Sequence, residues 1–123
     1  MAYNGVADLN NSGNIISTAK GLYEAYAIGI TTQWYINGLT NSGNITVEAE
    51  AGSSAYAGGI MSFEITDLTN SGNITVSAEG YAAFAEGISG LFIDGLTNSG
   101  TIKAEAICKE PMFLQESGAF AMG

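Results

Sequence analysis

The side chains of this chain that could do chemistry are almost all carboxylates. Its 123 residues include twelve Asp and Glu, three lysines, one cysteine and neither histidine nor arginine. Without histidine, no Ser–His or Cys–His pair can form for nucleophilic catalysis, and zinc sites built on Cys and His are excluded. Paired carboxylates can hydrolyse glycans when they stand about 5–10 Å apart. Acid-based glycan cleavage is therefore the enzymatic hypothesis that has to be weighed.

The formal charge of −9 limits the partners that this chain can have. Phosphate neutralisation requires a basic face, which argues against nucleic acid and equally against anionic lipid surfaces. No stretch approaches the about 20 apolar residues of a membrane-spanning helix. We therefore expect no nucleic-acid partner and no membrane insertion, and an acidic, lysine-poor exterior suits an extracellular or cell-surface protein.

The dominant feature of the sequence is a phrase that occurs four times. Residues Leu39–Ile45 read LTNSGNI, and closely similar phrases begin at Leu9, Leu68 and Leu96, at intervals of 28 to 30 residues. A near-constant period of this size indicates a stacked repeat array. We expect a single domain, 1–123, with repeat units 9–38, 39–67, 68–95 and 96–123, preceded by a partial coil over 1–8.

Each repeat contains three short stretches that suit strands. Ile45–Glu50 alternates apolar and polar residues, as half-buried strands do. The second stretch combines small and aromatic residues, as at Ala55–Ala57, and the third leads back to the next repeat leucine. Asn-Ser-Gly and other Gly-rich pieces supply turns. Because hairpins would separate equivalent strands, the pattern predicts an all-β parallel β-solenoid of about four coils, with three strands per coil.

In such a solenoid every position stacks on its equivalents in the neighbouring coils. We expect the repeated leucines and isoleucines to form the interior. The turn asparagines should form a ladder in one corner, where their amides can bond one another and the turn backbone. This asparagine ladder consists of Asn11, Asn41, Asn70 and Asn98.

An aromatic row accompanies the second stretch of each coil. Its members are Tyr26, Tyr56, Phe84 and Phe120. We favour an outer stripe, with the flanking alanines pointing inward; the alternative is that the rings fill the core. An outer stripe beside acids could hold sugar rings, whereas aromatic residues also occupy strand positions without any ligand.

The acids also fall into rows when the coils are stacked. Glu50 should lie next to Glu79 in the adjacent coil, with Lys20 on its other side. Mixed signs in one row indicate charge balancing on a solvated face rather than a catalytic pair or a weak calcium site. We expect no enzymatic activity, no cofactor and no metal. Cys108 is interpreted as an unremarkable thiol, with intermolecular pairing left open.

Two short phrases recur along nearly the whole chain. Leu-Thr-Asn-Ser-Gly-x-Ile and Ala-x-Gly-Ile occur at Leu39–Ile45, Leu68–Ile74, Leu96–Ile102, Ala27–Ile30, Ala57–Ile60 and Ala85–Ile88. They resemble the passenger-domain repeats of bacterial autotransporter and haemagglutinin-like adhesins. The resemblance implies a right-handed β-helix at the cell surface, and an adhesin segment that binds host or matrix glycans or proteins. Such short phrases specify fold more than function.

The two ends of the chain continue the repeat when copies are placed end to end. Gly123 would be followed by the next copy's Leu9 after nine residues, the same spacing as from Gly59 to Leu68. We therefore predict a head-to-tail filament of identical subunits; a fragment trimmed to whole coils is the alternative. The residues expected at the self-assembly ends are Met1, Tyr3, Val6, Ala119, Phe120 and Gly123.

The last coil is longer than the others. About seven extra residues fall within 107–117, when the spacing from Leu96 to Ala119 is compared with the earlier coils. Insertions in repeat arrays become loops on one face. We expect a surface loop, or a segment whose apolar Met112, Phe113 and Leu114 pack over the solenoid edge or a neighbouring subunit.

Overall fold

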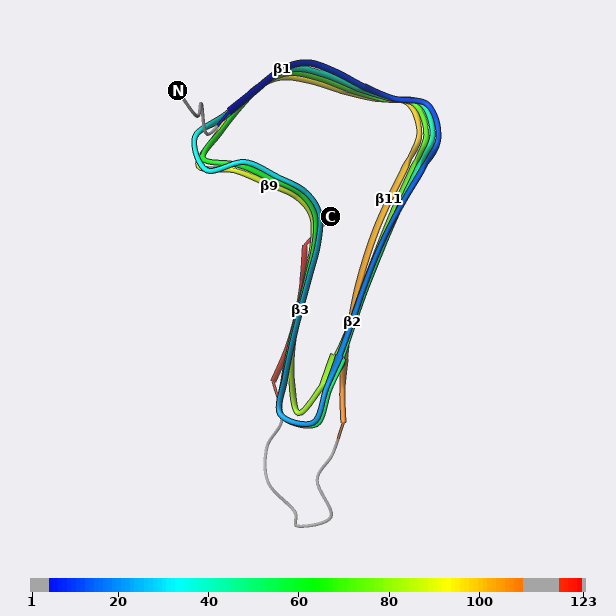
Figure 1. Cartoon of the computed structure of the whole chain (residues 1–123), viewed down its shortest axis with the longest axis vertical. Helices are drawn as coiled ribbons and strands as arrows, with labels where there is room; N and C mark the ends of the chain where they lie inside the picture. The colour runs from blue at the N-terminus through cyan, green and yellow to red at the C-terminus, as the bar shows by residue number, and fades with distance from the viewer. Residues whose placement is uncertain (1–4, 110–117, 123) are drawn as a thin grey trace.

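The computed structural model describes residues 5–109 and 118–122, and the regular elements among them are all strands (Figure 1). The twelve strands are β1 (Gly5–Asn11), β2 (Asn14–Gly21), β3 (Glu24–Thr31), β4 (Tyr35–Asn41), β5 (Asn44–Ala51), β6 (Ser54–Met61), β7 (Glu64–Asn70), β8 (Asn73–Gly80), β9 (Ala82–Ser89), β10 (Phe92–Asn98), β11 (Thr101–Cys108) and β12 (Gly118–Met122).

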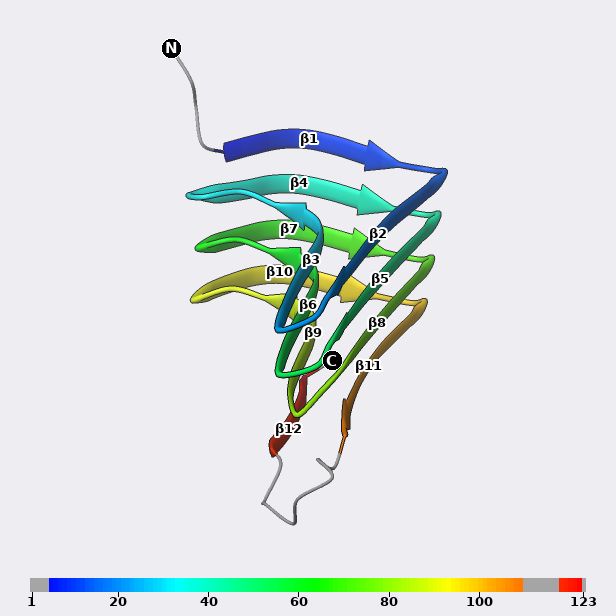
Figure 2. The same ribbon diagram turned by 60° about the horizontal axis from the view of Figure 1, so that its bottom comes forward.

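The strands form three parallel sheets, each with one strand from every coil. Sheet A has the order β1-β4-β7-β10, sheet B β2-β5-β8-β11 and sheet C β3-β6-β9-β12. The coils lie directly above one another, and Figure 2 shows them stacked from β1 at one end to β10 and β12 at the other. The predicted all-β parallel solenoid of about four coils, with three strands per coil, is confirmed.

Equivalent residues of the repeat pair with one another across the coils. Leu39 pairs with Leu9 and Leu68, and Ile45 pairs with Ile15 and Ile74. The side chains of Leu39, Leu68 and both inner isoleucines are completely buried. The interior therefore consists of continuous apolar rows, as the 28–30-residue period predicts.

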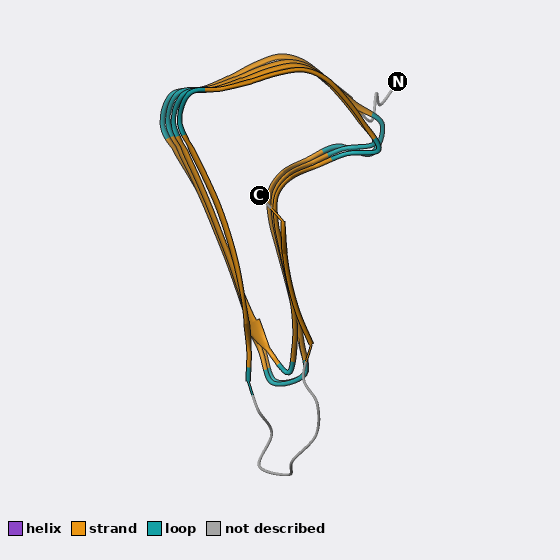
Figure 3. Ribbon diagram, turned by 180° about the vertical axis from the view of Figure 1, so that it is seen from behind, coloured by secondary structure: helices purple, strands orange, loops and turns teal. Residues whose placement is uncertain are grey.

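The cross-section is wide at one end and narrow at the other (Figures 1 and 3). Near the turns that join β2 to β3 and β5 to β6, sheets B and C run close together. The inward positions there are alanines, among them Ala49, Ala55 and Ala78, all nearly or fully buried. Small side chains let the two sheets approach, whereas Ile36, Leu39 and Ile60 fill the wider part.

The asparagine corner joins sheet A to sheet B. Asn41 Nδ2 donates to Asn70 Oδ1 at 2.7 Å and to the Gly43 carbonyl at 3.3 Å, and Asn41 and Asn70 are fully buried. Each carbonyl can only accept a hydrogen bond, so it fixes which end of the amide faces it. The ladder thus runs in one direction, from Nδ2 of one coil to Oδ1 of the next.

The residue before the repeat leucine of every coil has a left-handed backbone conformation, with positive φ. Asp8 and Asp67 have φ of 54°, and Gly38 and Gly95 have φ of 78° and 71°. The strand pairing skips these positions and resumes at the leucine. Aspartate and glycine are among the few residues that tolerate this backbone conformation, which explains why only they occupy it.

Replacing Asn70 by alanine should destabilise the chain much more than replacing Asn73. Asn70→Ala removes a buried amide together with its hydrogen bonds to Asn41 and Asn98, at a cost of about 1–3 kcal/mol. Asn73 makes a similar amide contact to Asn44 at 3.1 Å but is exposed, so Asn73→Ala should cost less than about 1 kcal/mol. Urea unfolding measures both; equal losses would contradict a structural role for burial in this ladder.

Candidate functional site

The first coil presents backbone N–H groups at the asparagine corner. In the second coil, Ser42 N and Gly43 N donate to Asn11 O at 2.9 and 3.2 Å, and Asn44 N donates to Gly13 O at 3.0 Å. The same pattern recurs in the third and fourth coils. The equivalent donors of the first coil belong to Ser12, Gly13 and Asn14, and no described residue accepts from them.

The fourth coil presents the matching acceptors at the same corner. The backbone oxygens equivalent to those of Asn11 and Gly13 are those of Asn98 and Gly100. No described backbone N–H donates to either of them. The asparagine ladder runs in the opposite sense, since its outermost group at the first coil is the acceptor Asn11 Oδ1 and that at the fourth coil is the amide nitrogen Asn98 Nδ2. One end of this corner thus offers backbone donors beside a side-chain acceptor, and the other end offers backbone acceptors beside a side-chain donor.

The apolar rows are also open at the last described coil. Leu96 and Ile93 are 44% and 42% exposed, whereas the equivalent Leu68 is fully buried. At the first coil, Val6, Leu9 and Ile15 are half-buried. Open strand edges with exposed core side chains recruit further strands unless something covers them.

Some of the residues expected at the self-assembly ends lie in these edge strands. Val6 is in β1 and pairs with Ile36, while Ala119 and Phe120 are in β12 and pair with Ala83 and Phe84. Met1, Tyr3 and Gly123 lie outside the described residues.

Only the start of the expected insertion lies within the described residues. Ile107 and Cys108 are still in β11, so strand pairing extends into the segment where the loop was expected, and residues 110–117, with Met112, Phe113 and Leu114, lie outside the described residues. Cys108 is a free thiol of intermediate exposure.

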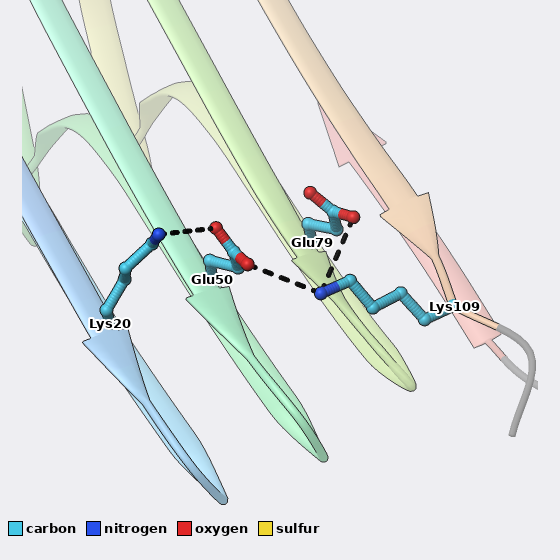
Figure 4. Close-up of polar contacts among 4 residues, drawn as sticks. All are labelled: Lys20, Glu50, Glu79 and Lys109. Carbon is cyan, nitrogen blue, oxygen red and sulfur yellow. Dashed lines mark hydrogen bonds and ion pairs between the residues drawn. The ribbon is translucent and has the colours of Figure 1, made fainter.

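The acidic row of sheet B is a chain of alternating charges (Figure 4). Lys20 Nζ lies 3.4 Å from a carboxylate oxygen of Glu50, and Lys109 Nζ lies 3.4 Å from Glu50 and 3.5 Å from Glu79. The hydrogen bond and charge of Lys20, followed by those of Lys109, lower the pKa of Glu50. A glycosidase needs one carboxyl that holds its proton, and this environment favours the opposite state of Glu50.

The aromatic row lies on the outer side of sheet C. Tyr26 is 64% exposed and Phe84 44%, whereas Ala25 and Ala27 are buried, so the outward orientation is the one observed. The rings of Tyr26 and Tyr56 stack with centroids 4.7 Å apart and an angle of 11°. The backbone of Phe120 continues the row in register.

A hollow of about 420 Å³ adjoins these rings and includes Glu24 and Ser54 in its lining. Just beyond it, Tyr56 Oη donates to Glu86 Oε2 at 2.8 Å and lies 3.2 Å from Met61 Sδ. Partial burial, with the hydrogen bond to Glu86, raises the pKa of Tyr56 above its ordinary range. The hollow therefore combines apolar ring surface with the carboxylate of Glu24, and the carboxylate of Glu86 lies nearby.

A row of exposed aromatic and aliphatic side chains, at the corner between sheets C and A, was not foreseen from the sequence. Trp34, Phe63 and Leu91 are 55%, 42% and 73% exposed, and Phe63 contacts Trp34 and Phe92 edge-on. Each of the three lies five residues before a repeat leucine, a periodicity that could have identified the row.

Within the described residues, no cluster of three or more His, Cys, Asp or Glu side chains is placed to hold a metal ion. The same residues contain no helix long and apolar enough to cross a membrane. Comparisons of the chain with protein-family models, with curated proteins and with solved structures give no match.

The stability contributed by Glu50 should depend on pH. Because its pKa is lowered in the folded state, its ion pairs stabilise the fold above the ordinary glutamate pKa of about 4.3, and this contribution is lost as the pH falls through the lowered value. Glu50→Gln should therefore be less stable than the parent near neutral pH, and this deficit should be smaller at about pH 3, below the ordinary glutamate pKa.

Urea unfolding at both pH values measures this difference. Glu48→Gln is the matched control, since Glu48 also points outward from β5 but has no ion pair among the described residues. A Glu50→Gln deficit of the same size at both pH values would contradict the assignment.

Proposed function

We propose that this chain is a non-enzymatic structural protein that stacks head to tail with further copies of itself, as the subunit of an extracellular or cell-surface filament. The supporting observation is the opposite polarity of the two ends at the asparagine corner. The first coil offers the N–H groups of Ser12, Gly13 and Asn14, and the fourth offers the carbonyls that would accept them.

The polarity favours a head-to-tail contact over a symmetric one. Two first coils placed face to face would bring N–H groups against N–H groups at this corner, and ladder Oδ1 against Oδ1. Buried donors without acceptors cost about 1–3 kcal/mol each. A first coil against a fourth coil satisfies them, and a heterologous contact of this kind propagates instead of closing.

The side chains of the two end coils also suit each other in this register. Leu96 would meet Leu9, and Ile102 would meet Ile15, which covers the apolar side chains exposed at the edges. On the outer side of sheet B, Glu105 would meet Thr18 with Lys20 diagonally adjacent. No pair of like charges would face each other directly across this sheet.

The second candidate is an adhesin-like module that binds glycans, in line with the resemblance of the repeat phrases. The hollow beside Tyr26, Tyr56 and Phe84, with nearby carboxylates, is the observation in its favour. Against it, Tyr26 and Tyr56 stack face to face, so the ring surfaces that a sugar would cover are largely used between coils. The aromatic row serves coil-to-coil packing at least as well as ligand binding.

Self-stacking predicts assembly that depends on protein concentration. Analytical ultracentrifugation of the purified chain should give a sedimentation coefficient that rises with concentration, with elongated particles in negative-stain images. A monodisperse monomer at the highest accessible concentration would sink the filament proposal.

Glycan binding makes a separate prediction. If the hollow is a sugar site, Tyr56→Ala should abolish the signal on a glycan array and leave assembly intact, while Tyr23→Ala, an exposed tyrosine outside the hollow, should change neither. If stacking is the main function, the parent chain itself should give no signal above background. A strong signal lost in Tyr56→Ala would favour the second candidate.

A further inference from the structure

Glycine is required in the asparagine corner of the second, third and fourth coils. A Cβ atom added to Gly43 would collide with the carbonyl oxygen of Gly13 in the preceding coil, far inside van der Waals contact. The same collision would occur between Gly72 and Gly43, and between Gly100 and Gly72. The coils stack so closely here that the obstacle is backbone, which cannot turn away as a side chain can.

The first coil has a glycine at the same position without the same need. A Cβ atom on Gly13 would have nothing within 4 Å among the described residues. Gly13 also lacks the positive φ that Gly38 and Gly95 adopt, so its backbone conformation is open to other residues. Among the described residues of a single copy, neither space nor backbone strain explains glycine at position 13.

We propose that Gly13 is the position that admits the carbonyl of Gly100 from a second copy of this chain and so sets the register of the head-to-tail contact. This inference rests on the proposed stacking function and names the residue on which it depends. If two copies stack at the spacing of the inner coils, a Cβ atom at position 13 would collide with the Gly100 carbonyl oxygen of the second copy. A Cβ atom at position 43 would collide with the Gly13 carbonyl oxygen in the same way within one copy.

The collision would also keep the surrounding groups apart. The N–H groups of Ser12 and Gly13 would then fail to donate to the Asn98 carbonyl oxygen of the second copy. The equivalent hydrogen bonds within one copy run from Ser42 N and Gly43 N to Asn11 O. Asn11 Oδ1 would lose the Nδ2 of the second copy's ladder. Position 13 therefore controls the whole corner of the contact, whereas the edge of the fourth coil is unaffected.

A copy substituted at position 13 can therefore join a filament at only one of its two ends. Its fourth coil can still receive the first coil of an unmodified copy, but its own first coil cannot dock. Gly13→Ala should therefore fail to assemble alone, and a small fraction mixed with the parent chain should shorten the filaments by capping one end.

The test compares Gly13→Ala with the parent chain in two measurements. Thermal unfolding at low concentration should give the same Tm for both. The concentration at which half of the protein sediments should rise at least about tenfold, which corresponds to a loss of about 1.4 kcal/mol per contact. Thr40→Ala, an outward substitution in the second coil and away from both end coils, should match the parent in both measurements.

Gly72→Ala supplies the complementary control, because its collision lies inside one copy and should lower Tm. A Gly13→Ala chain that assembles like the parent would overturn the inference and leave the stacking function standing. A Gly13→Ala chain with a lowered Tm would also overturn it, since the glycine would then serve the single copy. A parent chain that never assembles would overturn the stacking function and this inference together.

Discussion

Main-chain hydrogen bonding between equivalent positions of successive coils is the constraint on which the rest of this structure depends. Parallel strands lie about 4.8 Å apart, so every side chain must tolerate a near-identical neighbour at that distance above and below. Apolar residues meet this demand by packing in rows, as Leu39 does between Leu9 and Leu68. Asparagine meets it by donating to one neighbour and accepting from the other, and glycine by leaving room for a carbonyl.

The same constraint explains why much of the fold could be predicted from the sequence. A repeated phrase with a period of 28 to 30 residues leaves few arrangements in which equivalent strands are neighbours, and the in-register pairing of Leu39 and of Asn41 follows from it. The sequence also favoured an outward direction for the Tyr26 side chain. Its neighbours Ala25 and Ala27 point the other way and are small enough for the narrow part of the interior.

Other features depend on geometry that the period does not encode. The left-handed conformation at Asp8 and Asp67 arises from a local skip in strand pairing, which alternation of apolar and polar residues cannot reveal. Lys109 reaches back over two coils to Glu50, a contact between residues 59 positions apart that no repeat position predicts. The exposed corner row of Trp34 and Phe63 is periodic, yet its position outside the core depends on where the turn between sheets C and A bends.

The proposed function draws on the composition of the chain and on the ends of its described coils. The chain has no histidine, and the two lysines beside Glu50 lower its pKa, so the Glu50 carboxyl is not poised to donate a proton. The ends of the described coils, in contrast, carry matched and oppositely directed hydrogen-bonding groups. Repetition makes the two ends complementary almost automatically, because each end resembles the surface that the inner coils bury.

The most direct measurement of head-to-tail stacking is the axial repeat of the assembled protein by electron cryomicroscopy or fibre diffraction. Head-to-tail stacking predicts strands perpendicular to the fibre axis at about 4.8 Å spacing, with each copy adding four such steps, about 19 Å, and all copies pointing in one direction. Assemblies in which neighbouring copies are related by a two-fold axis, or in which the strand spacing is interrupted between copies, would contradict it.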